Sequence, residues 1–244
     1  MKNRKQLPNF GYLKNFSVDS SSIVAHLQEK NLLDYSKYTD IKVSANSKHK
    51  NFVIANEFSK SNFFTEDNTQ ALEGESYVQL YLTDFDETKS SNKVKLTKTS
   101  ILSRTKRLNP KSKYYLPEAD ELNYGIRNDL VTDVFSKILN MFSSKITRVR
   151  LACLKRNFSI KPHVDYDPSY IVRYHIPLIT NEQCMLHIVR NKVQYDIHLP
   201  NDGKIYFINT GHLHWASNDS DNERLHLIVD VHGQNELESL ESLG

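Results

Sequence analysis

The segment Arg224-Leu-His-Leu-Ile-Val-Asp-Val231 decides the fold class, because two kinds of side chain alternate along it. Successive side chains of a β-strand point to opposite faces of the sheet, so this segment would turn four apolar side chains to one face. The other face would carry Arg224, His226, Ile228 and Asp230. The apolar face is suited to packing under helices, whereas charged and imidazole groups on the other face indicate a polar interior.

A second segment, Ile171–Leu178, alternates in the same way. Arg173 and His175 would lie together on one face of this strand, opposite a run of apolar side chains. Two strands with the same division predict a sheet that separates an apolar core from a polar cavity.

Seven short strands are predicted after Thr147, with turn residues such as Asp167-Pro168 and Pro200-Asn-Asp-Gly203 between them. Strands spaced this closely indicate an antiparallel barrel or a jelly roll. The predicted strands are Arg148–Leu154, Ile160–Asp165, Tyr170–Leu178, Met185–Arg190, Val193–Leu199, Lys204–Asn209 and Arg224–Val231.

The first half of the chain is more polar and less informative. Ser76–Leu82 alternates like a strand, and Ile126–Phe142 has apolar residues at the spacing of an amphipathic helix that packs against a sheet. Thr88–Pro117 carries nine Lys or Arg and no acidic residue. Such a run is usually a solvated loop. Contact with nucleic acid is the alternative, although no binding motif accompanies it.

Composition excludes several classes of protein. The net charge of +3 demands no polyanionic partner, and two cysteines, Cys153 and Cys184, make no disulfide framework. No apolar run has the length of a signal peptide or of a membrane span, which needs ~20 residues. We expect a cytoplasmic protein with one integrated domain in three parts: an α+β extension (1–145), a β core (146–233) and a tail (234–244).

Histidine is concentrated in the second half of the chain, where eight of ten lie between His163 and His232. His163-Val-Asp165 would place an imidazole and a carboxylate on one face of a strand. A second imidazole, from Gly211-His-Leu-His-Trp215, would complete the two-histidine, one-carboxylate set that is associated with non-haem iron(II) oxygenases. On its own, His-x-Asp is equally a surface ion pair, so its significance depends on the residues that follow.

Arg148 to Gly233 resembles the aspartyl/asparaginyl β-hydroxylase family of iron(II)- and 2-oxoglutarate-dependent dioxygenases, which includes free-proline hydroxylases. The family pattern is His-x-Asp, an Arg-x-His strand, and a distal histidine with Asn four residues and Arg ten residues further on. This sequence matches each element in order, with His163-Val-Asp165, Arg173-Tyr-His175, His214, Asn218 and Arg224.

The resemblance implies a mainly β fold with flanking helices around a double-stranded β-helix, the cupin-like jelly roll. It implies that iron(II) is held by His163, Asp165 and His214, and that O2 and 2-oxoglutarate are co-substrates. Arg224 would pair with the distal carboxylate of 2-oxoglutarate, since guanidinium geometry suits a carboxylate. Arg173 and His175 would make further contacts to 2-oxoglutarate or to a carboxylate of the substrate.

His212 competes with His214 for the third ligand position. The Asn and Arg spacings favour His214, which leaves His212 as a cavity-wall residue. Substrate contacts are expected from residues close to the metal in sequence, namely Tyr166, Asp167, Tyr170, His212 and Asn218. We interpret His187, His198 and His232 as structural or exposed.

The implied reaction is hydroxylation of an unactivated carbon. We expect a free amino acid or a small derivative as substrate, with an Asp or Asn residue of a peptide or protein as the alternative. A non-enzymatic cupin-like module that binds zinc or manganese is a second class of function that the His and carboxylate ligands permit. Arg224 argues against it, because a passive metal binder needs no buried guanidinium.

Overall fold

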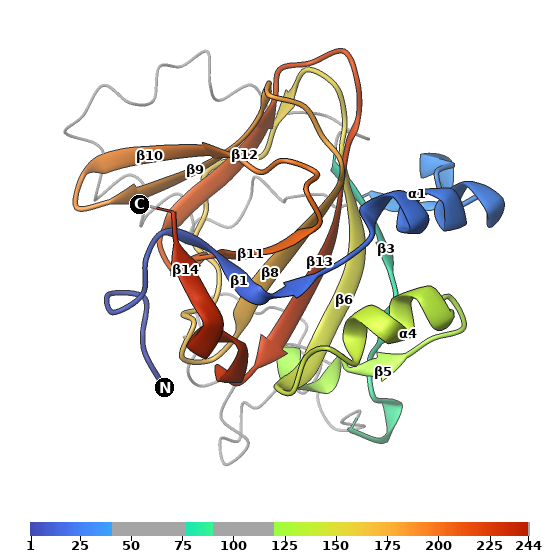
Figure 1. Cartoon of the computed structure of the whole chain (residues 1–244), viewed down its shortest axis with the longest axis horizontal. Coiled ribbons are helices and arrows are strands. Elements are labelled where there is room, and N and C mark those ends of the chain that lie inside the picture. Colours follow the sequence, from blue (N-terminus) through green and yellow to red (C-terminus); the bar gives the residue numbers. More distant parts are fainter. Residues whose placement is uncertain (41–76, 90–119, 244) are drawn as a thin grey trace, which may run out of the picture.

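Two antiparallel β-sheets face each other in the computed structural model, which describes residues 1–40, 77–89 and 120–243 (Figure 1). The larger sheet has eight strands in the order β14-β1-β11-β8-β13-β6-β3-β2, and the smaller has four in the order β10-β9-β12-β7. A separate two-stranded sheet is formed by β4 and β5, and β4 lies against β6 of the larger sheet. The prediction of a mainly β, jelly-roll core with flanking helices is confirmed.

The strands of the larger sheet are β1 (Phe10–Ser17), β2 (Thr39–Asp40), β3 (Tyr77–Tyr81), β6 (Lys145–Leu154), β8 (Val172–Ile179), β11 (Lys204–Ile208), β13 (Arg224–His232) and β14 (Leu240–Ser242). Those of the smaller sheets are β7 (Phe158–Ser159), β9 (Cys184–Arg190), β10 (Val193–His198), β12 (Leu213–Asn218), β4 (Thr83–Asp84) and β5 (Ile126–Arg127). The helices are α1 (Ser20–Glu29) and α4 (Asp133–Leu139), with short 3-10 turns at Tyr35–Lys37, Glu87–Lys89, Glu121–Asn123 and Asn235–Ser239. Among these residues no helix is long and apolar enough to cross a membrane.

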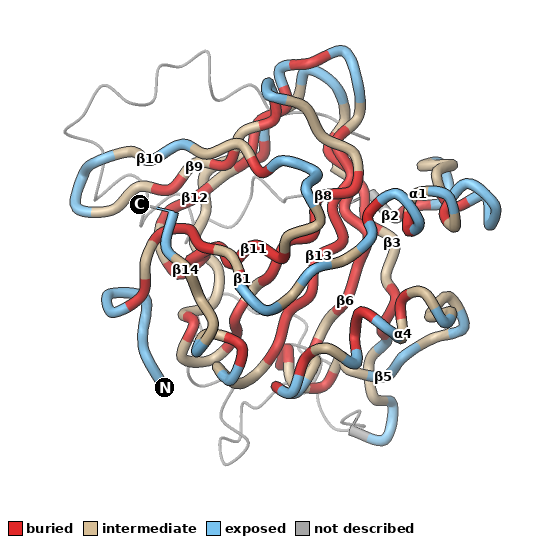
Figure 2. Tube along the Cα trace, in the orientation of Figure 1, coloured by how far each residue is buried: buried red, intermediate tan, exposed pale blue. Residues whose placement is uncertain are grey.

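The outer face of the larger sheet is covered by the two helices. Ile23 and Leu27 of α1, together with Phe135 of α4, belong to one buried apolar cluster with alternate residues of β6, β8, β11 and β13. Asp19 caps the start of α1 by accepting a hydrogen bond from the Ser22 amide at 3.0 Å. Figure 2 shows the central strands of this sheet as the most continuously buried part of the chain.

The inner face of the larger sheet meets the smaller sheet through a second apolar cluster. Leu154 of β6 and Ile208 of β11 pack there with Ile188 of β9 and Ala216 of β12. Alternation places the polar side chains of β8 and β13 on this inner face, as the sequence predicted. The interior between the sheets is therefore apolar in part and charged in part.

Two expected elements differ from the prediction. Ile160–Asp165 does not form a strand, since only Phe158–Ser159 pairs with β12 and His163 then forms an isolated bridge with His214. Pro162 lacks the amide hydrogen that a continuous ladder needs.

The helix predicted over Ile126–Phe142 covers only Asp133–Leu139. Ile126 is 51% exposed and pairs with β4 instead. The Asn128 side chain ends that pairing, because its Oδ1 accepts a hydrogen bond from the Leu130 amide and its Nδ2 donates to the Tyr81 carbonyl. The local turn therefore prevails over helical periodicity.

The N-terminal and C-terminal segments both join the larger sheet. β1 pairs with β11 on one side and with β14 on the other, and β3 pairs with β6, which confirms the strand predicted at Ser76–Leu82. Most of the basic run Thr88–Pro117 lies outside the described residues.

Candidate metal centre and buried anion site

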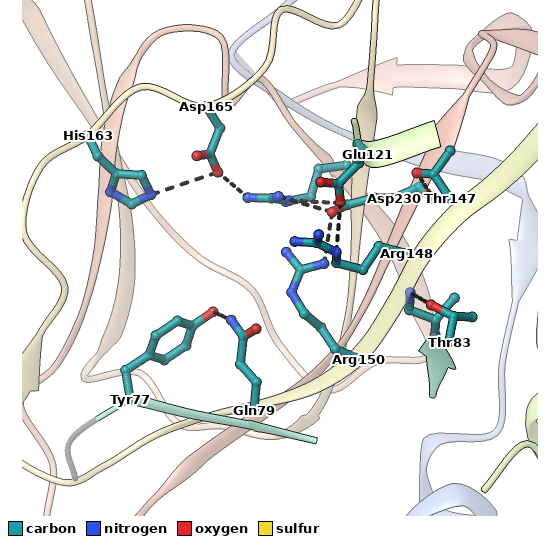
Figure 3. Close-up of polar contacts among 12 residues, drawn as sticks. Tyr77, Gln79, Thr83, Glu121, Thr147, Arg148, Arg150, His163, Asp165 and Asp230 are labelled. Atoms are coloured by element: carbon teal, nitrogen blue, oxygen red, sulfur yellow. Dashed lines mark hydrogen bonds and ion pairs between the residues drawn. The ribbon is translucent and has the colours of Figure 1, made fainter. Parts of the chain in front are cut away.

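Two imidazoles and a carboxylate converge at one end of the space between the sheets. The ligand atoms of His163, Asp165 and His214 all lie within 4.8 Å of one another. Asp165 Oδ2 is 3.8 Å from Nε2 of His163 (Figure 3). It is also 3.8 Å from Nε2 of His214. The three residues that the sequence pattern selected as metal ligands are thus brought together by the fold.

The tautomers of the two histidines suit a metal. His163 Nδ1 lies 2.8 Å from the Lys161 carbonyl, and His214 Nδ1 lies 3.0 Å from the His212 carbonyl. A carbonyl only accepts hydrogen bonds, so each Nδ1 must carry the proton and donate it. Each Nε2 is then left with a lone pair directed at the other ligands, which is the usual arrangement for metal-binding histidines.

The backbone fixes the ligands in place. The amide of each histidine donates to the carbonyl of the other at 2.9 Å, and the Asp165 amide donates to Thr210 at 3.0 Å. The ligand loop is therefore pinned to the start of β12 without forming a strand. The donor set, its spacing and its tautomers fit a divalent metal ion such as iron(II).

Asp165 is held ionised. Burial alone would raise the pKa of this carboxyl, but the charge of Arg173 and the nearby His163 and His214 hold it well below its usual range. Arg173 Nη1 donates directly to Asp165 Oδ2. Burial lowers the pKa of His214 to about 3, with a further contribution from His163, so its imidazole is neutral and able to bind metal.

Arg173 joins the metal centre to a buried carboxylate on the neighbouring strand. Its Nε and Nη2 donate to the two oxygens of Asp230 at 2.8 and 3.0 Å. Arg150, on β6, donates from Nη1 to Asp230 Oδ2 at 2.8 Å (Figure 3). The sequence placed Arg173 with the co-substrate, yet in the structure its donors are engaged by two carboxylates of the chain itself.

A second polar cluster lies further along the same face, where Arg224, His226 and His175 are all buried. The two imidazoles approach with their Nδ1 atoms 3.2 Å apart. Nε and Nη1 of Arg224, and Nε2 of His226, are buried and have no hydrogen-bond partner among the described residues. Buried donors without partners are rare and costly, so this cluster is suited to a ligand that brings acceptor oxygens.

The charges in this cluster are unbalanced. Burial lowers the pKa of Arg224. Burial, followed by the Arg224 charge, lowers the pKa of both His175 and His226 well below the ordinary histidine value. Both imidazoles are therefore neutral at pH 7 and the cluster carries one net positive charge, which an anion would neutralise.

The residues predicted to contact substrate have varied surroundings. The Asn218 amide is fully buried and donates to the carbonyls of Leu154, Lys155 and Asn222, so it fixes a turn. Asp167 accepts hydrogen bonds from Ser169 and from the Arg4 amide, which is also a turn contact.

Tyr166 and Tyr170 lie next to the ligand loop, with ring centroids 5.0 Å apart. The Tyr170 hydroxyl donates to Asp120. His212 lies outside the metal cluster, and its Nε2 contacts the Arg4 carbonyl at 3.1 Å. Contact of the two tyrosines with a substrate stays a prediction.

Three histidines have the structural surroundings expected of them. His187 lies between Asp196 and Ser217 and stacks on Trp215, with ring centroids 4.8 Å apart. His198 contacts the Cys184 carbonyl, and His232 contacts that of Tyr170.

Sequence reasoning missed the part played by Arg150 and Asp230. The available signal was a charged residue at an alternate position of each of two otherwise apolar strands, since a buried charge generally requires a partner. The alternation placed Asp230 on the polar face, but the pairing itself depends on the register of three strands.

Residues 126–233 match the family model described as Aspartyl/Asparaginyl beta-hydroxylase. The match covers the metal ligands, Arg173, His175 and Arg224. It confirms the resemblance found in the sequence, and with it the expectation that the chain carries an enzyme domain.

Solved structures show partial likenesses. A 2OG-Fe(II) oxygenase family oxidoreductase from Burkholderia pseudomallei is 17% identical over 43% of this chain and 55% of its own, with a TM-score of 0.32. A Pseudomonas putida prolyl-4-hydroxylase is 16% identical over 40% of this chain and 56% of its own, at 0.29. A cupin domain from Bordetella pertussis is 16% identical over 38% of this chain and 88% of its own, also at 0.29. The likeness spans about half of the length of the first two proteins.

Proposed function

We propose that this chain, whose residues 126–233 form an aspartyl/asparaginyl β-hydroxylase domain, is an iron(II)- and 2-oxoglutarate-dependent dioxygenase that hydroxylates an unactivated carbon. The observation that carries the proposal is the combination of two sites on one interior. A metal-ligand set, His163, Asp165 and His214, shares that interior with Arg224, a buried guanidinium without a partner in the described chain. A metal-binding module without a co-substrate has no need of this buried guanidinium.

The proposed roles follow from the geometry. His163 and His214 present Nε2 lone pairs, and Asp165 supplies an anionic oxygen, which leaves the other positions of an octahedral metal open. Bound iron(II) would supply the activation of O2 coupled to oxidation of 2-oxoglutarate to succinate and carbon dioxide. Arg224 would form a charge-assisted pair with one carboxylate of 2-oxoglutarate, and His175 would add a hydrogen bond.

We propose a free amino acid or a small derivative as the substrate. The N-terminal segment supports a restricted approach to the metal, because it packs against the loops that carry the ligands. The Arg4 guanidinium donates to the Gly211 carbonyl at 2.7 Å, and a Cβ at Gly211 would meet Pro168 at 3.0 Å and Arg4 at 3.1 Å. An Asp or Asn residue of a peptide is the alternative class, and the cytoplasmic location expected from composition stays a prediction.

The test is an anaerobic titration of the iron(II)-loaded protein with 2-oxoglutarate. We expect the weak visible charge-transfer band of a chelated complex, because two oxygens of the co-substrate would bind the iron. Arg224→Met should weaken this titration by roughly a hundredfold, since it removes a buried charge-assisted pair worth about 3 kcal/mol. His212→Ala is the matched control for His214→Ala, and only the latter should abolish iron binding.

A band that persists unchanged in Arg224→Met would remove the proposed role of this residue. No band in folded, iron-loaded protein would favour the alternative, a cupin-like module that binds zinc or manganese. If the band forms, succinate release measured across the free amino acids, and then across Asp- and Asn-containing peptides, separates the two substrate classes.

A further inference from the structure

A chain of alternating charges runs from the middle of the larger sheet to the metal centre. Arg150 contacts Asp230 (Figure 3), Asp230 contacts Arg173, and Arg173 contacts Asp165. Asp230 is completely buried, and the Arg150 side chain is 5% exposed. Asp165, at the other end, is 24% exposed and lies in a loop outside any strand. This series of ion pairs thus connects the buried centre of the larger sheet to Asp165, which lies outside regular secondary structure.

We propose that Asp230, acting through Arg173, positions the Asp165 carboxylate for metal binding. This inference rests on the proposed function in one respect, namely that Asp165 is a metal ligand. It gives Arg173 a role different from the co-substrate contact that the sequence resemblance implied, and it gives Asp230 a role for which the resemblance provided none.

The geometry explains how Asp230 sets the orientation of Asp165 through Arg173. Asp230 accepts from Arg173 at two points, Nε and Nη2, and a planar guanidinium held at two points has its third nitrogen fixed in direction. That third nitrogen, Nη1, donates to Asp165 Oδ2. A lysine in place of Arg173 would keep the charge but lose this directional transfer.

Asp230 is itself held in place from two sides. Arg150 donates to its Oδ2 at 2.8 Å, and the backbone of β13 lies between β6 and β8. The opposing residues in register are Arg148 on β6 and Arg173 on β8, so the Asp230 side chain shares its face with cations from both neighbouring strands. Burial would raise the pKa of Asp230, but Arg150 and Arg173 hold it well below its usual range. The carboxylate is a fixed anion around which Arg173 is oriented.

Arg224 provides the contrast that separates this role from anion binding. Its Nε and Nη1 are buried and have no partners in the part of the chain that the structure describes, whereas Nε, Nη1 and Nη2 of Arg173 each contact a carboxylate of the chain. An arginine reserved for a ligand leaves donors free, and Arg173 is engaged at each of these three nitrogens. Its contacts are those of a residue that positions another.

The experiment measures metal affinity, with Co(II) as a probe that needs neither 2-oxoglutarate nor turnover. The visible absorption of Co(II) would be titrated in wild type, Asp230→Asn and Arg173→Lys. We expect the Co(II) dissociation constant to rise by ~10- to 100-fold in both variants, the range typical for residues that orient metal ligands. Arg148→Gln is the matched control, because Arg148 lies on the same strand as Arg150 and pairs with Glu121 instead.

A double-mutant cycle shows whether Asp230 acts through Arg173. The variant with both Asp230→Asn and Arg173→Lys should bind Co(II) no more weakly than the weaker of the two single variants, because both changes break one path. Losses that multiply would overturn the inference, since Asp230 would then act independently of Arg173. Arg173→Lys with wild-type Co(II) affinity would overturn it as well, because charge alone would be sufficient.

Two measurements keep the outcomes separate. Urea unfolding of each variant identifies a protein that has failed to fold, and Arg173→Lys, at a partly exposed site, then carries the test in place of Asp230→Asn. Asp165→Ala tests the proposed function on its own. If it leaves Co(II) affinity unchanged, the metal assignment fails. If it weakens Co(II) binding while both positioning variants bind normally, only the present inference fails.

Discussion

Arg150 and Arg224 are buried arginines in neighbouring strands of one sheet, yet their surroundings differ. Arg150, on β6, has Asp230 at 2.8 Å, whereas Nε and Nη1 of Arg224, on β13, have no partner in the described chain. Burial disfavours the charged form of both. Burial is the largest single effect on Arg150 too, but the charge of Asp230, with smaller contributions from Tyr77 and Glu121, leaves the pKa of Arg150 raised, while burial prevails at Arg224 and lowers its pKa.

The difference separates a structural charge from a charge kept for a ligand. A buried ion pair with its hydrogen bonds made is part of the fold, and breaking it leaves the partner uncompensated. A buried cation without a partner lowers stability in the free protein, so its presence indicates a ligand that supplies the missing anion. Within one sheet, therefore, the group around Asp230 is proposed to organise the candidate metal centre, and the group around Arg224 is the proposed site for the co-substrate.

The largest expected effect is on stability. Arg150→Met should lower the free energy of unfolding of the metal-free protein by about 3 kcal/mol, because it leaves Asp230 with only Arg173 as a cationic partner. Arg224→Met should change it by less than about 1 kcal/mol, or raise it, since it removes a buried charge that has no ion-pair partner in residues 1–40, 77–89 and 120–243. Urea denaturation of the two variants beside wild type makes the measurement. An equal loss in both would mean that Arg224 has a partner within the chain.

The next effect is on the stabilisation that 2-oxoglutarate provides. Here Arg224→Met should be affected more than Arg150→Met. At a hundred times its dissociation constant, 2-oxoglutarate should stabilise the metal-loaded wild type by about 2.7 kcal/mol. In Arg224→Met, a hundredfold weaker affinity would reduce this gain to about 0.4 kcal/mol at the same concentration. Arg150→Met should keep most of the gain despite its lower starting stability. Thermal unfolding with and without the co-substrate checks this, and a gain that survives in Arg224→Met would move the anion site elsewhere.

The sequence predicted the faces of the strands better than their partners. Period-two alternation placed Arg173, His175, Arg224 and Asp230 on the inner face, because side-chain direction in a strand is a local property. The pairing of Arg173 with Asp230 depends on the register between β8 and β13, which alternation in either strand leaves open. Local patterns therefore predicted a polar interior, whereas its division into two groups of charges required the structure.

The metal ligands were predictable for a related reason, although the expected strand was wrong. His163 and Asp165 are two residues apart, and the loop that replaces the strand still directs both side chains toward His214. The strand β12, which carries His214, was not predicted, because polar residues occur on both of its faces. The spacing of the ligands was more informative than the secondary structure assigned to them.

The smallest expected effect is a dependence of stability on pH in the metal-free protein. Burial depresses the pKa values of His175 and His226, and that of His214 to about 3, so these rings stay neutral when folded but are protonated in the unfolded chain below about pH 6.5. The free energy of unfolding should therefore fall as the pH drops through about 6.5. At pH 5.5 each neutral buried ring should lower it by about 1.4 kcal/mol relative to pH 8. His226→Leu should remove the contribution of one ring. The urea midpoint should then fall less steeply between pH 8 and 5.5 than it does in wild type. An unchanged slope would mean that His226 titrates in the folded protein as it does in the unfolded chain. The ring would then add a second positive charge beside Arg224 as the pH falls, and an anion would bind more tightly at low pH.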